Sequence, residues 1–355
     1  MKDREKTQTY MPPESRGMTI EQEEQVATVK KILREKTDKG EWDHFTPEFV
    51  DTQTPVTNMA ELLKNDETTR RIKKESKMSQ DHASIRIKTD LPVTVVHIGD
   101  THIGSVFTNM KEVTRKLKVV QDTPNMYAVF MGNMIDNAIP AQFPDNMLNS
   151  TMPPDKQVEV MQTIAKEMDA KGKVLAAVES PCHEGWTYNK TGQDVNRLIY
   201  GFEGRHFPVL ENGGEVDLQV GKEKYKAAFY HQTGPFNSNF NDTHAVKQMH
   251  RLNLQMNEDW VAGAHNHVGA VEEVYEGTGR RRRKVTYMRT GSEKGTGDLH
   301  DTFIQARGGK TGEPTGQMIH LFPDKHRTMS NVDFDDGVLC HESIYLTEMA
   351  KKDKK

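Results

Sequence analysis

The chain changes character near residue 90, where short apolar runs begin to alternate with longer amphipathic segments. The run from Val93 to Ile98 is rich in β-branched residues and predicts a buried strand, and Met110 to Val120 has helical spacing with a Lys/Arg face. Further strands are expected at 127–131, 174–178, 207–210, 216–220, 225–230, 260–264, 270–275, 284–287 and 318–322. Further helices are expected at 158–168, 195–200 and 243–254. The pattern predicts an α/β fold of two sheets that face each other, with helices outside.

The part of the chain before residue 90 is rich in Lys, Glu, Asp and Thr and poor in apolar residues. Two helix-start signals stand out there, Thr19 followed by Gln22 and Asn58 followed by Glu61. We therefore expect a small helical N-terminal extension at 1–88, with a linker around 77–84. The main domain is expected at 89–355.

Basic residues gather in two places. The stretch from Lys64 to Lys77 is typical of a helix-turn-helix that contacts DNA, but also of a solvated helix face or an arm that docks a protein. The run from Arg280 to Lys284 lies between two predicted strands. It marks either a solvated hairpin tip or, if it lies beside a ligand cleft, a surface that attracts a phosphate backbone. The sequence leaves both pairs of interpretations open.

The composition narrows the class of protein. Of 355 residues, 48 are Lys or Arg and 52 are Asp or Glu, so the net charge is 48 − 52 = −4. This value excludes a protein that binds nucleic acid or anionic membranes through an overall positive charge. The two cysteines, Cys182 and Cys340, are too few for a disulfide framework and favour a reducing compartment. Because no secretory h-region and no membrane-spanning apolar run occur, we expect a soluble cytoplasmic protein without a membrane partner.

Metal-capable side chains follow five of the predicted strands, at the points where the apolar runs stop. In chain order they are Asp100 and His102, Asn133 and Asp136, Cys182 with His183 and Glu184, His231, and His265 with His267. Because the carboxyl ends of strands in an α/β sheet line one ligand crevice, these side chains are expected to share one site. The spacing of two between Asp100 and His102, and between His265 and His267, would place each pair on the same side of an extended segment.

The donor set predicts both the kind and the number of metal ions. Carboxylate oxygen together with several imidazoles suits Mn²⁺, Fe or Zn²⁺, and so many donors are too many for one tetrahedral ion. We therefore expect two divalent metal ions as cofactors. Two ions about 3.5–4 Å apart can clamp a phosphoryl group, activate a water and stabilise the leaving oxygen.

Taken in order, these blocks resemble the calcineurin-like metallophosphoesterase superfamily, whose motifs are D-x-H, G-D-x-x-D, G-N-H-[DE], H and G-H-x-H. The chain reads Asp100-x-His102, Gly132-Asn133-x-x-Asp136, Cys182-His183-Glu184, His231 and Gly263-x-His265-x-His267. The resemblance spans about residues 92 to 330, and 288–292 with 318–321 is similar to phosphoesterases carried by tailed bacteriophages. It implies a four-layer αββα metallophosphoesterase sandwich, located in the host cytoplasm if the chain is phage-encoded.

The resemblance also implies a role for each site residue. The implied metal ligands are Asp100, His102 and His267 for the first ion, Cys182, His231 and His265 for the second, and Asn133 between the two ions. His183 would act on the leaving group or stabilise the phosphate, with Glu184 orienting it. The implied activity is hydrolysis of a phosphomonoester or phosphodiester by metal-bound hydroxide, as in phosphatases, phosphodiesterases and nucleases, so nucleic acid is one possible substrate.

Two ligand positions depart from the superfamily pattern, because the bridging Asp is Asn133 and the Asn of G-N-H is Cys182. In one hypothesis the site is compensated: a Cys182 thiolate supplies the anion that Asn133 lacks, and it favours Zn²⁺ or Fe over Mn²⁺. In the other the site has decayed, because a neutral amide separates two cations poorly. The protein would then be a catalytically impaired phage accessory protein that binds nucleic acid or protein, with residues 1–90 as the contact.

Overall fold

The computed structural model describes residues 48–49, 79–139, 147–233, 241–253, 257–297 and 314–352, all within one compact unit, His44–Lys355. The helix-start signals at Thr19 and Asn58 and the basic stretch from Lys64 to Lys77 lie outside these ranges. The predicted helical extension and its DNA or protein contact therefore remain expectations.

One hydrogen-bonded sheet runs through the described part of the chain. Its strands, in spatial order, are β12 (Thr328–Asn331), β11 (Gln317–Leu321), β3 (Val93–Ile98), β4 (Met126–Phe130), β5 (Val174–Val178), β6 (Val209–Val220), β7 (Glu223–Tyr230), β8 (Trp260–Gly263), β10 (Arg283–Arg289) and β9 (Ala270–Glu276). Two more strands extend it sideways, since β2 (Ser79–Ile87) pairs with β6 and β1 (Glu48–Phe49) pairs with β2. Strands β3 to β6 are mutually parallel, and so are β7, β8 and β10.

Strand β6 joins two halves of this sheet. Its first residues pair with β5, whereas its length from Gly213 to Val220 pairs with β7. Between these parts the backbone of Asn212 and Gly213 has positive φ, and a Cβ at Gly213 would collide with the Tyr230 ring. The sequence predicted two strands here, at 207–210 and 216–220. The structure has one strand that bends at the Asn-Gly-Gly step and belongs to both halves.

The two halves pack face to face through an apolar core. Val95 and Val129 from β3 and β4 belong to the same buried cluster as Phe229 and Trp260 from β7 and β8. Each of these side chains is nearly or completely shielded from solvent. Because burial of apolar area is the main stabilising contribution to folding, this core holds the halves together.

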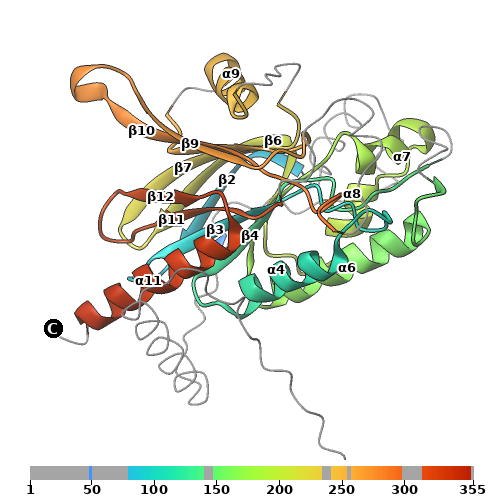
Figure 1. Ribbon diagram of the computed structural model, residues 1–355, viewed down its shortest axis with the longest axis horizontal. Coiled ribbons are helices and arrows are strands. Elements are labelled where there is room, and N and C mark those ends of the chain that lie inside the picture. Colours follow the sequence, from blue (N-terminus) through green and yellow to red (C-terminus); the bar gives the residue numbers. More distant parts are fainter. Residues whose placement is uncertain are drawn as a thin grey trace, which may run out of the picture. The chain divides into compact units, whose positions relative to one another are not determined.

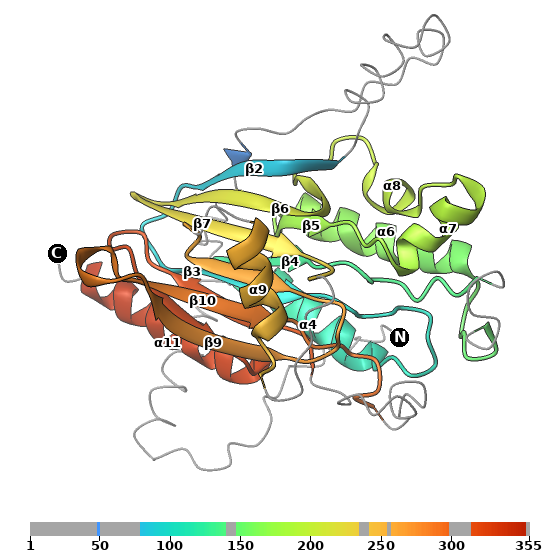
Figure 2. The ribbon, with the colours of Figure 1, turned by 90° about the horizontal axis from the view of Figure 1, so that it is seen from above.

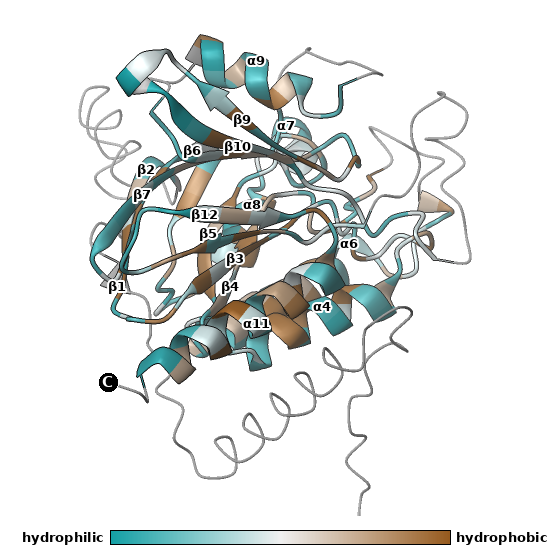
Figure 3. Cartoon of the chain, turned by 60° about the vertical axis from the view of Figure 1, so that its left-hand side comes forward, coloured by the Kyte–Doolittle hydropathy of each residue, from teal (hydrophilic) through white to brown (hydrophobic). Residues whose placement is uncertain are grey.

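Helices cover the outer faces of both halves. On one side α4 (Met110–Asp122), α6 (Pro154–Ala170) and α11 (Phe334–Lys352) lie along the half that contains β3 and β4 (Figure 1), and they share a second apolar cluster with it. On the other side α9 (His244–Asn253) packs on β8 and β10 (Figure 2). Figure 3 shows brown, apolar positions on α4 and on the neighbouring strands. The order is helix, sheet half, sheet half, helix, so the predicted α/β fold is confirmed.

Several elements differ from the sequence prediction. Strand β2 occupies residues 79–87, where a linker was expected, and Ala83, Ile85 and Ile87 bury one of its faces. Helix α11 was not predicted, nor was α7 (His183–Thr191), which begins inside the predicted site. The short α8 (Val195–Tyr200) lies where it was expected. Among the helices of the described ranges, none combines the length and the apolar character that crossing a bilayer requires.

Candidate metal centre

Every predicted site residue lies just beyond the carboxyl end of a strand. Asp100 and His102 follow β3, Asn133 follows β4, and Cys182 to Glu184 follow β5; His231 follows β7, and His265 and His267 follow β8. The first three strands belong to one sheet half and the last two to the other. Because both halves contribute parallel strands whose ends meet, residues more than 160 positions apart come into contact.

The first of two ligand groups consists of Asp100, His102 and His267. The three offer one donor atom each within 4.8 Å of one another. The Nε2 atoms of the two imidazoles are 2.9 Å apart, and Asp100 Oδ1 lies 3.6 Å from His267 Nε2 and 3.9 Å from His102 Nε2. Such a group of one carboxylate and two imidazoles at the end of buried strands has the composition of a transition-metal site.

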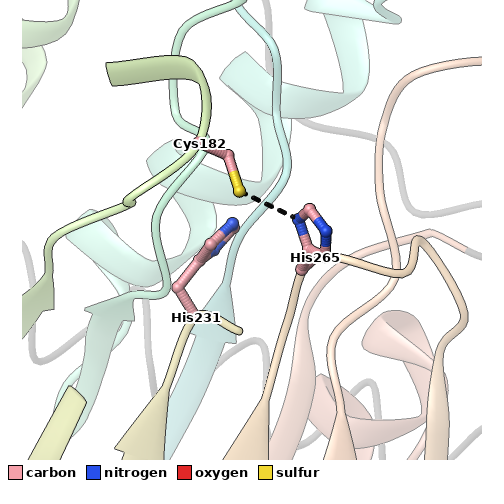
Figure 4. Close-up of side chains that lie close together, drawn as sticks. All are labelled: Cys182, His231 and His265. Carbon is pink, nitrogen blue, oxygen red and sulfur yellow. Dashed lines mark hydrogen bonds between the residues drawn. The ribbon is translucent and has the colours of Figure 1, made fainter. Parts of the chain in front are cut away.

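The second ligand group consists of Cys182, His231 and His265, which point toward one another (Figure 4). Cys182 Sγ lies 3.5 Å from His265 Nδ1. His231 Nδ1 donates to the carbonyl oxygen of Met131 at 2.7 Å, which fixes the tautomer and leaves Nε2 with its lone pair. A hydrogen bond of this kind behind an imidazole is what orients metal-ligating histidines.

Buried histidines elsewhere in the described residues behave differently. His97, His250, His320 and His341 each have a hydrogen-bond partner for both ring nitrogens. In contrast, His231 Nε2 is buried without any partner in the same part of the chain. Because an unpaired buried polar atom is costly, this nitrogen indicates a site that is completed by a ligand.

Asn133 connects the two groups through Ser180. Its Nδ2 donates to Asp100 Oδ1 at 3.1 Å, and its Oδ1 accepts from Ser180 Oγ at 2.5 Å. Ser180 Oγ in turn accepts from the Cys182 amide at 3.1 Å. Ser180 was not predicted from the sequence. Its position two residues before Cys182 was the available signal.

The backbone of the site is in an unusual conformation. Asp100, His102, Asn133, His265 and His267 all have positive φ, between 48° and 76°. This region is unfavourable for residues with a side chain, by about 1 kcal/mol or more each. The spacing of two therefore does not reflect an extended segment, as the sequence suggested. The chain turns at each motif, so that His265 joins the second group and His267 the first.

His183 is held by its neighbours at the edge of the first group. Its Nδ1 donates to the carbonyl oxygen of Asp136 at 2.5 Å, and its ring lies 4.4 Å from that of His102. Glu184 was expected to orient His183, but its Oε1 instead accepts from the amides of Met134 and Ile135 at 2.7 and 3.3 Å. Glu184 thus fixes the loop that carries Asn133.

Asp136, one of the metal-capable side chains in the sequence, contacts Lys294 and His102. Its Oδ1 accepts from Lys294 Nζ at 3.1 Å and lies 3.2 Å from His102 Nδ1. Although Asp136 could complete a third donor group with His102 and His183, the lysine already neutralises it. Lys294 was not singled out in the sequence, where nothing distinguishes it from other lysines.

Burial governs the protonation of the site. It lowers the pKa of His231 and His267 to about 3, and it raises the pKa of Asp100 well above its usual range. It also raises the pKa of the Cys182 thiol to about 12 and that of Glu184 to about 7. Neutral imidazoles are the form that binds metal, and a divalent cation would favour the ionised carboxylate and thiolate. The donor set therefore fits divalent metal ions.

The basic run from Arg280 to Lys284 does not lie beside these groups. It forms η1 (Gly279–Arg281) and the start of β10, whereas the site lies beyond the other end of β10 at Arg289. The two ends of this seven-residue strand are roughly 20 Å apart. Arg282 packs over the exposed Tyr275 ring at 4.7 Å, so the run belongs to the tip of the β9–β10 hairpin (Figure 1).

Comparison with known proteins found solved structures that are similar at low sequence identity and low TM-score. No protein-family model matches the sequence, and no curated protein matches it. A crystal structure of nuclease MPE from Pseudomonas putida is similar at 10% identity and a TM-score of 0.28, over 67% of this chain and 87% of that one. The calcineurin-like phosphoesterase YfkN from Bacillus subtilis is similar at 10% identity and a TM-score of 0.36, over 74% of this chain and 99% of that one. Similarity at this level does not assign the chain to a family.

Proposed function

We propose that this protein is a metal-dependent phosphoester hydrolase of the calcineurin-like metallophosphoesterase type. The observation that carries the proposal is the pairing of two adjacent donor groups, Asp100 with two imidazoles and Cys182 with two imidazoles, linked by Asn133 and Ser180. Two neighbouring cation positions at a strand-end crevice suit an in-line displacement at phosphorus.

Each donor group would hold one divalent ion. The first ion would lie among Asp100, His102 and His267, and the second among Cys182, His231 and His265. When bound, the ions supply Lewis acidity and lower the pKa of water for attack on phosphorus. Thiolate in the second group favours Zn²⁺ or Fe there.

The chain's own residues position the reaction. His183 keeps its Nδ1 proton on the Asp136 carbonyl, so its Nε2 is the atom that can exchange a proton with, or hydrogen-bond to, the leaving oxygen. Ser180 donates to Asn133 Oδ1 and Glu184 accepts from the next amide, so both hold the loop that carries Asn133. Because Asp100, His102 and His231 are almost entirely shielded from solvent, charges beside them interact strongly.

Metal content and ester hydrolysis test this function directly. We expect protein purified without chelator to contain close to two equivalents of Zn²⁺ or Fe and to hydrolyse bis-p-nitrophenyl phosphate, with the activity lost in chelator and restored by metal. A screen of single-stranded DNA, duplex DNA, cyclic nucleotides and phosphopeptides would then identify the substrate class. Metal far below one equivalent together with no hydrolysis would sink the proposal and leave the accessory-protein interpretation.

Replacing Cys182 tests the compensated site. Cys182→Ser removes the only sulfur donor of the two groups, so Zn²⁺ affinity of the second position should fall about 100-fold, since even groups behind a ligand contribute 10–100-fold. The measurement is competition with a chromogenic chelator. Cys340→Ser is the matched control, because Cys340 lies on α11 and belongs to neither donor group. Equal affinities in the two variants would contradict a thiolate ligand.

A further inference from the structure

Arg289 lies directly under the segment that carries two of the predicted ligands. It is the last residue of β10, which runs between β8 and β9, and it pairs with Gly263 on one side and with Ala270 on the other. The connection from β8 to β9, residues 264–269, holds His265 and His267 and must cross the end of β10 at this point. The backbone of Arg289 therefore lies next to the segment that carries one ligand of each donor group.

The residues after Arg289 anchor it to the site. The amide of Thr290 donates to the Gly263 carbonyl oxygen at 2.8 Å, and Ser292 Oγ donates to the Asp100 carbonyl oxygen at 2.5 Å. One short segment thus contacts the chain before His265 and the chain at Asp100. With its backbone held on both sides, Arg289 has little freedom to move away from the ligand groups.

Arg289 differs from the other buried cations of the described ranges. Lys116 is paired with Glu293, Lys294 with Asp136, and Lys173 donates to backbone carbonyl oxygens. Arg289 is only 3% exposed; its Nη1 donates to the Asp242 carbonyl oxygen at 2.8 Å, but its Nη2 has no acceptor within that part of the chain. A buried guanidinium with an unused donor is costly unless an anion completes it.

The charge of Arg289 reaches the donor groups. Arg289 pairs with Gly263, two residues before His265, and Ser292, three residues after Arg289, donates to the Asp100 carbonyl oxygen. An anion that entered the site would therefore meet a fixed positive charge beside the metal ligands. The planar fork of a guanidinium matches the oxygens of a phosphoryl group better than an ammonium does.

We propose that Nη2 of Arg289 binds an oxygen of the phosphoryl group, which makes Arg289 an anion-binding position that acts together with the metal centre. This proposal rests on the proposed hydrolase function, because it assigns a phosphoryl oxygen as the missing acceptor. Lys294 is a less suitable anion-binding residue, because the Asp136 carboxylate already neutralises its charge.

Binding of inorganic phosphate to the metal-loaded full-length protein tests the inference without turnover. In Arg289→Met the dissociation constant for phosphate, measured by calorimetry, should rise about 10- to 100-fold, as for a lost hydrogen bond to a charged group. Arg289→Lys, which keeps the charge but loses the fork, should fall between that variant and the unmodified protein. Arg283→Met is the matched control: Arg283 begins the same strand and its Nη1 also donates to a carbonyl oxygen, that of Glu258, so phosphate binding should not change.

The outcomes separate this inference from the proposed function. If the protein hydrolyses no ester but its phosphate affinity still depends on Arg289, the proposed hydrolase function is rejected and the role of Arg289 in anion binding is supported. If esters are hydrolysed and Arg289→Lys and Arg289→Met retain metal, phosphate affinity and KM, the inference is overturned. Loss of metal from both variants would assign Arg289 to holding the donor groups and would equally overturn it.

Discussion

Asp100→Asn should abolish catalysis and empty the first metal position. Asp100 provides the only carboxylate of the two ligand groups, and its two oxygens face the Asn133 amide and the His265 amide. A neutral amide in its place removes the anion that offsets the cation's charge. We expect turnover of bis-p-nitrophenyl phosphate to fall about 1000-fold, which corresponds to about 4 kcal/mol of transition-state stabilisation, and metal content to fall by about one equivalent.

Asp169→Asn is the matched control for this loss. Asp169 is also a buried carboxylate, and its Oδ2 accepts from the amide and Nδ1 of His206 at 3.1 and 3.2 Å. It lies at the end of α6, before β5 begins, so it is at the opposite edge of the sheet from the site. Its substitution should leave metal content and turnover unchanged. Full activity in Asp100→Asn would refute a metal position at that residue.

Asn133→Asp should make the stability of the protein depend on metal. Asn133 Nδ2 donates to Asp100 Oδ1 at 3.1 Å, so an aspartate would place two carboxylates against each other in a buried site. Without metal, the variant should lose about 2 kcal/mol of unfolding free energy, the size of a hydrogen bond to a charged group. With metal, the added anion separates two cations, so binding should tighten and preference should shift toward Mn²⁺. Thermal melting with chelator and with Mn²⁺ or Zn²⁺ measures both effects.

Asn125→Asp controls for the general effect of a buried asparagine. Asn125 has nearly the same backbone conformation, φ 51° against 49° for Asn133, and it is also buried. Its Nδ2 donates to Thr89 Oγ1 and to the Pro92 carbonyl oxygen, before β4 and β3 begin, so it lies at the opposite end of these strands from the ligands. It should lose stability equally with and without metal. Identical melting behaviour of the two variants would contradict a cation beside Asn133.

The fold was predictable where one face of an element is strongly apolar. The buried runs of β3, β4 and β5 and the spacing in α4 stand out in the sequence because sheet and helix periods differ. Helix α11 does not, since its buried positions include Gly337, His341 and Tyr345 in place of an aliphatic stripe. Strand β2 was hidden by the charged residues on its exposed face, although Ala83, Ile85 and Ile87 alternate as a half-buried strand should.

The candidate site was predictable as a set of residues but not as an arrangement. Strand ends in an α/β sheet converge, so the sequence predicted that Asp100 and His231 would share a site. The spacing of two residues did not reveal the backbone conformation. His265 and His267 both have positive φ, and His265 belongs to the second donor group whereas His267 belongs to the first. The contacts of Ser180 and Glu184 depend on which loops meet, and this is decided by packing between segments distant in the chain.

The bent strand β6 has a consequence for how the protein folds. Because both halves of the sheet hydrogen-bond to it, neither donor group can form before β6 has joined them, and His102 must find His267 across 165 positions of chain. Contacts so distant in sequence close late and slowly. Metal would thus bind the finished fold and not the unfolded chain, and at 100 times its dissociation constant it would add about 2.7 kcal/mol to the resistance against unfolding. The metal centre would then form at the end of folding, and the bound ions would hold the two halves of the sheet together.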